Sequence, residues 1–296
     1  MNKKSVFYTH SSAITALFVM GNAVINLPVK NADEYTFFSY LVTSLLSVAT
    51  ILILTPLANW VFGEEVGNTG RFKKIIIFIF CLLTAVFALF CAGDAFLDFG
   101  KFVGEILIAS SEKAVIFLIF FAVSVFFVLR RQEDILKFAL LGFWFCLLFV
   151  LFFFLGAAEN YDMRNIFIFS LPDFKTAVSQ AKPYFFNPFL PVLLIPVYQA
   201  LVFRKIRKTA LVLGAVSGYV MLGLCILGSL LLFGPELAGR LDYPYASAVS
   251  TVTVGRIFTR MDGFSYIIYF VSSLIKVTVC SFIIRSCLEK MNRIFN

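Results

Sequence analysis

Eight long apolar stretches constrain the fold of this chain more than any other feature. Each is close to the roughly 17 to 25 residues that an α-helix needs to cross the hydrocarbon core of a bilayer. They cover residues 11–29, 37–60, 75–92, 114–129, 135–158, 185–203, 209–233 and 264–284. With 60% hydrophobic and 14% charged residues, the composition also lies outside that of soluble domains. We therefore expect an all-α polytopic membrane protein, with a single transmembrane domain over residues 1–296.

The charged residues between these stretches predict how the chain crosses the membrane. Lysine and arginine are abundant in alternate connections, as at residues 71–74 and 204–208, whereas acidic residues are more frequent in the others. Because basic connections stay on the cytoplasmic side, we expect both termini in the cytoplasm and an even number of spans. The net charge of +8 is dispersed rather than gathered on one soluble face, so it does not indicate a nucleic-acid partner.

Two connections on the opposite side are too long to be simple turns. Residues 173–182 have the pattern of a short helix that Asp173 could cap, and residues 245–261 place Arg256 and Arg260 on one helical face. We expect a short extracytoplasmic helix in each place. The second is either an interfacial helix over the bundle or a solvated connector without a function.

The first stretch is interrupted where a spanning helix should be regular. Gly21, Asn22, Asn26 and Pro28 lie within eight residues, and together they predict a local loss of helix at membrane depth. Unwinding would free carbonyl groups before the break and N–H groups at the start of a second half-helix, and these could hold a cation and a carboxylate. The alternative is a kinked helix in which Gly21 only allows close packing.

The sixth stretch, residues 185–203, contains a second interruption. Asn187, Pro188, Pro191 and Pro196 lie within ten residues, which makes continuous helical hydrogen bonding unfavourable. Two broken spans separated by four others are typical of inverted repeats with a ligand at their interface near the bilayer midplane. The alternative is ordinary proline kinks in an unrelated helical bundle.

The last stretch carries a lysine near its middle. Lys276 is too deep for easy snorkelling, so we expect it to face the bundle interior, with the hydroxyls of Ser272 and Ser273 nearby. We predict that Lys276 lies close to the first break, where it either stands in for a coupling cation or responds to protonation. The alternative is a structural lysine whose ammonium donates to backbone carbonyls.

No sequence pattern indicates catalysis, a cofactor or a metal. His10 is the only histidine, and the six cysteines lie in or at the end of apolar stretches without the close spacing of a metal site. There is no phosphate loop and no nucleophile elbow, so we expect neither an enzyme nor a cofactor. The apolar stretches also contain no obvious acidic residue, which disfavours a strongly cationic ligand.

Three segments together resemble the spore germination permease family, the B-type membrane subunits of nutrient germinant receptors in the amino acid/polyamine/organocation (APC) transporter superfamily. They are GNAVINLP in the first stretch, PYFFNPFLPVLLIPVY in the sixth, and YPYASAVSTVTVGRIFTRMDGFSYIIYF before and within the last. The resemblance implies a LeuT-like bundle of ten helices. Eight stretches are two short of that number, so we expect the second repeat to lack its last two helices.

The resemblance also implies a function and partners. It places a small nutrient such as an amino acid between the broken helices, in contact with Gly21, Asn22 and Ala23 and with residues 187–191. We also expect Asn26, in the first break, to contact the ligand. It further implies an A-type membrane subunit, a C-type lipoprotein and the inner membrane of a spore. The leading prediction is a nutrient-sensing subunit that signals germination. The alternatives are a proton-coupled amino acid transporter and a membrane scaffold that binds no ligand.

Overall fold

A computed structural model of the chain describes residues 3–27, 29, 32, 35–62, 71–107, 113–162, 164–165, 184–203, 208–252 and 262–295. Within these ranges the fold is helical throughout and contains no strand, as the sequence predicts. The α-helices are α1 (Lys3–Met20), α2 (Thr36–Phe62), α3 (Arg71–Phe102), α4 (Lys113–Leu129), α5 (Gln132–Gly156), α8 (Leu190–Val192), α9 (Leu194–Phe203), α10 (Lys208–Ala238), α11 (Pro244–Thr251) and α12 (Asp262–Phe295). Shorter turns of tighter or wider helix are η1 (Gly21–Ala23), η3 (Val103–Leu107), η4 (Ala158–Asn160) and η6 (Phe185–Phe189).

Five of the described helices are long and apolar enough to cross a membrane, which confirms a polytopic all-α membrane protein. They are Thr36–Phe62, Phe72–Ile106, Gln132–Gly156, Lys208–Ala238 and Asp262–Ile294. Two shorter apolar helices, Phe117–Leu129 and Asn187–Val202, coincide with the fourth and sixth predicted stretches. The number of eight crossings and the sidedness of the termini stay predictions.

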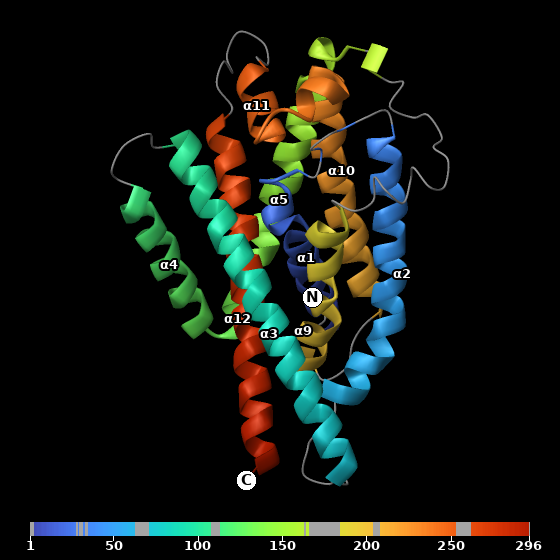
Figure 1. The fold of residues 1–296 in the computed structure, drawn as a ribbon, viewed down its shortest axis with the longest axis vertical. Coiled ribbons are helices and arrows are strands. Elements are labelled where there is room, and N and C mark those ends of the chain that lie inside the picture. The colour runs from blue at the N-terminus through green and yellow to red at the C-terminus, as the bar shows by residue number, and fades with distance from the viewer. Residues whose placement is uncertain are drawn as a thin grey trace.

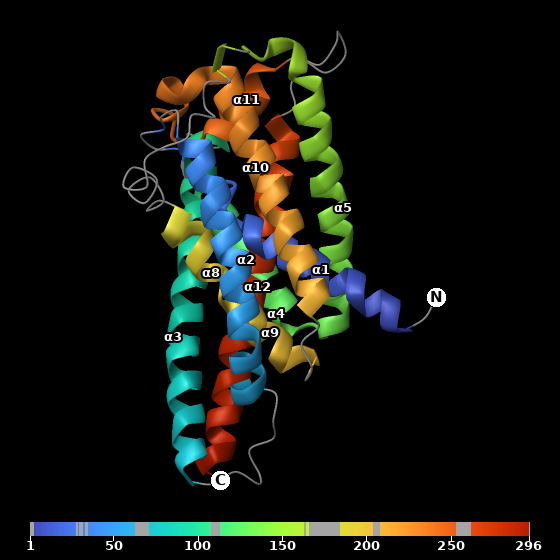
Figure 2. The ribbon, with the colours of Figure 1, turned by 90° about the vertical axis from the view of Figure 1, so that its right-hand side faces the viewer.

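The long helices stand side by side, and α1 crosses between them at a steep tilt (Figures 1 and 2). Helix α12 packs along α3, and α1 packs against α10, α5 and α12. Side chains on the outer faces of α2, α3, α4 and α5 are mostly large, apolar and exposed, as a lipid-facing surface requires. The segment from Ala13 to Met20 is instead almost fully buried, so α1 forms the centre of the packed core.

Two glycines one turn apart bring α10 against the backbone of α1. A Cβ atom at Gly214 would lie 2.5 Å from the Ser12 carbonyl oxygen, and one at Gly218 would lie 2.7 Å from the Ala16 carbonyl oxygen. This is the GxxxG arrangement, in which small residues allow two membrane helices to approach closely. It fixes the height of α1 in the bundle, and with it the position of the first break.

The structure describes the two predicted extracytoplasmic helices only in part. Helix α11 (Pro244–Thr251) coincides with the start of the predicted helix 245–261, and the chain is extended at Val252. Residues 253–261, which include Arg256 and Arg260, lie outside the described residues, as does the whole predicted helix 173–182.

Candidate functional site

The first break follows directly after α1. Helix α1 ends at Met20, residues 21–23 form the tight turn η1, and residues 24–27 are irregular. Gly21 has a φ of +33°, a region that side chains other than glycine rarely adopt. A Cβ atom here would also lie 2.5 Å from Cδ of Lys276. Backbone conformation and the lysine stem therefore both require glycine at this position.

The second half-helix predicted after this break is absent from the described residues. The chain between Ala23 and Thr36, as far as the structure describes it, contains turns and bends but no helix. The predicted row of free N–H groups that would hold a carboxylate at the start of such a half-helix is therefore not found there. The residues around the break contribute side chains instead.

Asn22 bridges three elements at the break. Its side-chain nitrogen Nδ2 donates to Oδ2 of Asp94 at 2.8 Å and to Oδ2 of Asp98 at 2.5 Å, both on α3. Its side-chain oxygen Oδ1 accepts a hydrogen bond from Nζ of Lys276 on α12. Asn22 is completely buried. The amide thus separates one ammonium group from two carboxylates, and it uses both of its side-chain N–H groups to do so.

Lys276 lies beside the first break, where it is 1% exposed. Its ammonium nitrogen lies 6.0 Å from the ring centroid of Phe18, in a cation–π arrangement. One turn earlier, the Ser272 hydroxyl donates to the Gly21 carbonyl oxygen at 3.0 Å and shares this proton with the Ile268 carbonyl at 2.7 Å. The neighbouring Ser273 hydroxyl is buried and makes no hydrogen bond in the described part of the chain.

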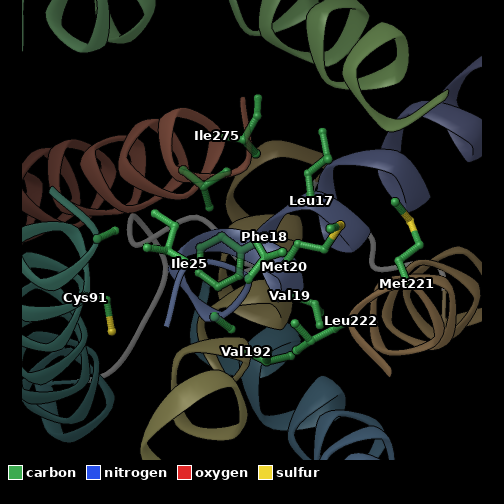
Figure 3. Close-up of a cluster of buried hydrophobic side chains, with 14 of the residues drawn as sticks. Leu17, Phe18, Val19, Met20, Ile25, Cys91, Val192, Met221, Leu222 and Ile275 are labelled. Carbon is green, nitrogen blue, oxygen red and sulfur yellow. The ribbon is translucent and has the colours of Figure 1, made fainter. Parts of the chain in front are cut away.

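The side chains around the end of α1 form a tightly packed apolar shell (Figure 3). Phe18 and Met20 lie at its centre, and Cys91 of α3, Leu222 of α10 and Ile275 of α12 surround them. All of these side chains are buried. On the side of α1, the polar bridge of Asn22 is therefore covered by hydrocarbon, where an unpaired charge would be costly.

The second break lies in η6, where Asn187 has φ −150° and ψ 115° within an otherwise helical segment. Helix α8 follows from Leu190, a turn at Leu193 separates it from α9, and η6 is in contact with η1. The side-chain oxygen of Asn187 is buried and accepts no hydrogen bond from the described residues. Pro188 is buried beside it. Both predicted interruptions are thus irregular, and they adjoin one another.

A cavity of about 680 Å³ lies where the two breaks meet α3. Its lining consists of Asn26, Leu27, Phe87, Phe90, Cys91, Asp94, Asp98, Lys101, Glu105, Asn187, Leu190, Pro191, Asp242 and Tyr243. Three of the predicted ligand-binding residues, Asn26, Asn187 and Pro191, belong to this lining. The other predicted residues are buried and do not belong to this lining: Gly21, Asn22, Ala23, Pro188, Ser272, Ser273 and Lys276.

The acidic wall of the cavity was not predicted from the sequence. The third apolar stretch was expected to end at residue 92, but helix α3 continues to Phe102 and its apolar span includes Asp94 and Asp98. The expectation that no acidic residue lies within a span is therefore wrong. Asp94, Asp98, Lys101 and Glu105 follow one another at intervals of four, three and four residues, which is the spacing of one helical face. This spacing was the available signal.

The outer end of the cavity is also acidic. Glu105 and Asp242 are exposed, and the Tyr243 hydroxyl donates to Oε2 of Glu105 at 2.6 Å. Burial and the adjacent Glu105 carboxylate raise the pKa of Tyr243, so its phenol keeps its proton and remains a donor. This hydrogen bond joins η3 to the segment before α11.

Comparison with known proteins gives one informative match. A family model described as "Spore germination protein" matches residues 8–296, which is nearly the whole chain. No curated protein matches the chain.

Proposed function

We propose that this chain, which belongs to the spore germination protein family, is the nutrient-sensing, permease-like subunit of a germinant receptor. A small nutrient such as an amino acid would bind in the cavity between η1, η6 and α3. The observation that carries the proposal is the position of this cavity, which is lined from both broken segments. Such a position is typical of ligand sites in transporter-like bundles.

The hydrogen bonds of Asn22 provide a route from the cavity to the rest of the bundle. Asp94 and Asp98 line the cavity, and both accept hydrogen bonds from Asn22, which also binds Lys276. A ligand that engages either carboxylate competes with Asn22 and changes the balance of contacts among η1, α3 and α12. Its differential affinity for the two arrangements would shift their populations, and this shift is the signal.

Lys276, Ser272 and Ser273 would provide the cation-like part of this site. The Lys276 ammonium occupies the buried position next to the break, and the Ser272 hydroxyl holds the Gly21 carbonyl. In this role the lysine is a fixed positive charge that stabilises the broken end of α1. The partners would be an A-type membrane subunit and a C-type lipoprotein in the inner spore membrane, with both termini of this chain in the cytoplasm.

One observation favours a second candidate, a proton-coupled amino acid transporter. The buried ammonium of Lys276 is only one amide group away from two carboxylates. A proton that binds to a carboxylate would alter this arrangement, as proton coupling requires. The two functions differ in flux: a transporter accumulates labelled substrate in vesicles under a pH gradient, whereas a receptor binds the substrate without net uptake.

The test is thermal unfolding of the full chain in lipid nanodiscs with a panel of amino acids, nucleosides and sugars. A ligand at 100 times its Kd should stabilise the protein by about 2.7 kcal/mol. Asn187→Leu, in the cavity wall, should remove the stabilisation. Asn59→Leu, in α2 outside the cavity lining, should retain it. No stabilisation by any member of the panel would reject the proposal and favour a scaffold without a ligand.

A further inference from the structure

We infer that the cavity selects ligands of net positive charge, such as a basic amino acid or a diamine, and that Asp94 and Asp98 receive the ligand's ammonium group. The inference rests on the proposed function, because it names the chemical class of nutrient that the same cavity would bind. It reverses the expectation from the sequence that a strongly cationic ligand is disfavoured.

The acidic side chains at the inner end of the cavity favour a cationic ligand. Asp94 is half-buried and Asp98 is 9% exposed, and both lie within 2.8 Å of the same nitrogen atom of Asn22. Lys276 supplies one positive charge behind them. Two carboxyl groups outnumber the one ammonium group in this poorly solvated place. A ligand ammonium balances the excess of acidic side chains, whereas a ligand carboxylate would add to it.

Asn187, which lines the cavity from the second break, provides independent evidence that the ligand donates a hydrogen bond. The Asn187 side-chain oxygen is buried at the second break, and no described residue donates to it. A buried acceptor without a donor costs free energy, which a ligand N–H group would recover. The acidic side chains and this free amide oxygen are all acceptors. An ammonium group, with three donors and no acceptor, matches this lining.

The exposed side chains at the entrance of the cavity also favour a cationic ligand. Glu105 and Asp242 are exposed at the cavity, and Lys101 is the single basic side chain among the lining residues that the structure describes. Among the described lining residues, four acidic side chains therefore outnumber this one basic side chain. A surface of this sign attracts cations and repels anions before they reach the site.

The experiment compares pairs of compounds that differ in charge but little in shape. The full chain in nanodiscs is titrated with the cationic L-arginine and its neutral analogue L-citrulline. A second titration compares the cationic 1,4-diaminobutane with the neutral 1,4-butanediol and the anionic succinate. Each Kd is obtained from thermal shifts. We expect the cationic member of each pair to bind at least about 10-fold more tightly, since a charge-assisted hydrogen bond is lost in the neutral one.

Variants assign this preference to the acidic wall. Asp94→Asn should weaken L-arginine binding by about 10- to 100-fold, the range for losing a charge-assisted hydrogen bond, and bring arginine and citrulline closer together. Asp134→Asn makes the same chemical change in the first turn of α5, outside the cavity lining, and should leave both affinities unchanged. Lys101→Met removes the competing positive charge and should tighten L-arginine binding several-fold.

The possible results separate this inference from the proposed function. Equal binding of arginine and citrulline, preference for succinate, or weaker arginine binding in Lys101→Met would overturn the inference while leaving a nutrient receptor intact. Binding of neutral amino acids alone would do the same. If no compound of any charge binds, the proposed function fails as well. If Asp94→Asn does not fold, the opposite effect expected of Lys101→Met still decides.

Discussion

Replacing Asn22 by leucine tests the bridge between the first break and the two helices that flank it. The two side chains are similar in size, so the change removes hydrogen bonds with little change in packing. Lys276 then loses its amide partner while it stays 1% exposed. Removing one partner of a buried charge costs about 3–5 kcal/mol. We expect the free energy of unfolding to fall by this amount.

A double-mutant cycle separates the bridge from general damage. Lys276→Met alone removes the charge and leaves the Asn22 oxygen without its donor, at a cost of about 1–3 kcal/mol. Once Lys276 is methionine, Asn22→Leu no longer leaves a buried ammonium without its amide partner. The double variant should therefore be more stable than the sum of the single changes predicts, by at least about 1 kcal/mol.

The assay is equilibrium unfolding of the purified protein in mixed micelles of increasing SDS content. Asn59→Leu is the matched control, because the Asn59 side-chain oxygen is buried without a hydrogen-bond donor in the described structure. Its replacement should be neutral or stabilising. Additive effects of Asn22→Leu and Lys276→Met, or a cost for Asn22→Leu no larger than that of the control, would refute the bridge.

Four further predictions concern three glycines and Lys276. Gly21→Ala should lower the free energy of unfolding by about 1–3 kcal/mol, because its positive φ and the Lys276 stem oppose a Cβ atom. Gly93→Ala, where a Cβ would meet nothing within 4 Å, should be neutral or stabilising in the same SDS titration. Gly218→Leu should separate α10 from the Ala16 carbonyl and cost about 1–3 kcal/mol or more, with a lower yield of folded protein; normal yield and stability would argue against the close approach. Lys276→Met should also end the thermal stabilisation by nutrients, and an unchanged ligand response in a normally inserted variant would reject its role.

The helical fold could be predicted because it depends on local sequence. Long apolar stretches can satisfy their backbone groups in a bilayer only as helices, and the structure forms helices in each of the eight. The two breaks could also be predicted, since glycine, asparagine and proline weaken helix locally at residues 21–28 and 187–191. The close packing of α10 on α1 had a local signal as well, the glycine spacing of Gly214 and Gly218.

The contents of the site depended on contacts between distant residues, which local patterns do not contain. Asn22 meets Asp94 and Asp98 across more than 70 residues and Lys276 across 254 residues. The hydropathy pattern ended the predicted third span at residue 92, before Asp94 and Asp98. Two charged residues lower the mean hydropathy of a window, but they do not end the helix. Helix α3 continues because one of its faces is covered by α12 and lines a polar cavity. A charged stripe on one helical face is compatible with such an environment.

The second half-helix expected after the first break is not found in the part of the chain that the structure describes. Free N–H groups were expected to bind a carboxylate there, but in the described residues Asn22 and the acids of α3 occupy the polar positions around the break. Among the described residues, polar side chains, several of them on α3, line the cavity. A site for a carboxylate was expected at this break, whereas the described acidic and amide side chains offer hydrogen-bond acceptors.

The most direct measurement of the central claim is protection of a reporter cysteine in the cavity by a bound nutrient. Asn26 lines the cavity and is exposed, whereas the six native cysteines are buried, and Cys91, which also lines the cavity, is replaced by serine in the reporter background. Asn26→Cys should react with a polar thiol reagent, and the nutrient that stabilises the protein most should slow this reaction at least about 10-fold at 10 times its Kd. Ser250→Cys, exposed on α11 outside the cavity lining, should react at the same rate with and without the nutrient. Equal labelling of Asn26→Cys with and without a saturating nutrient would contradict binding between the two broken segments.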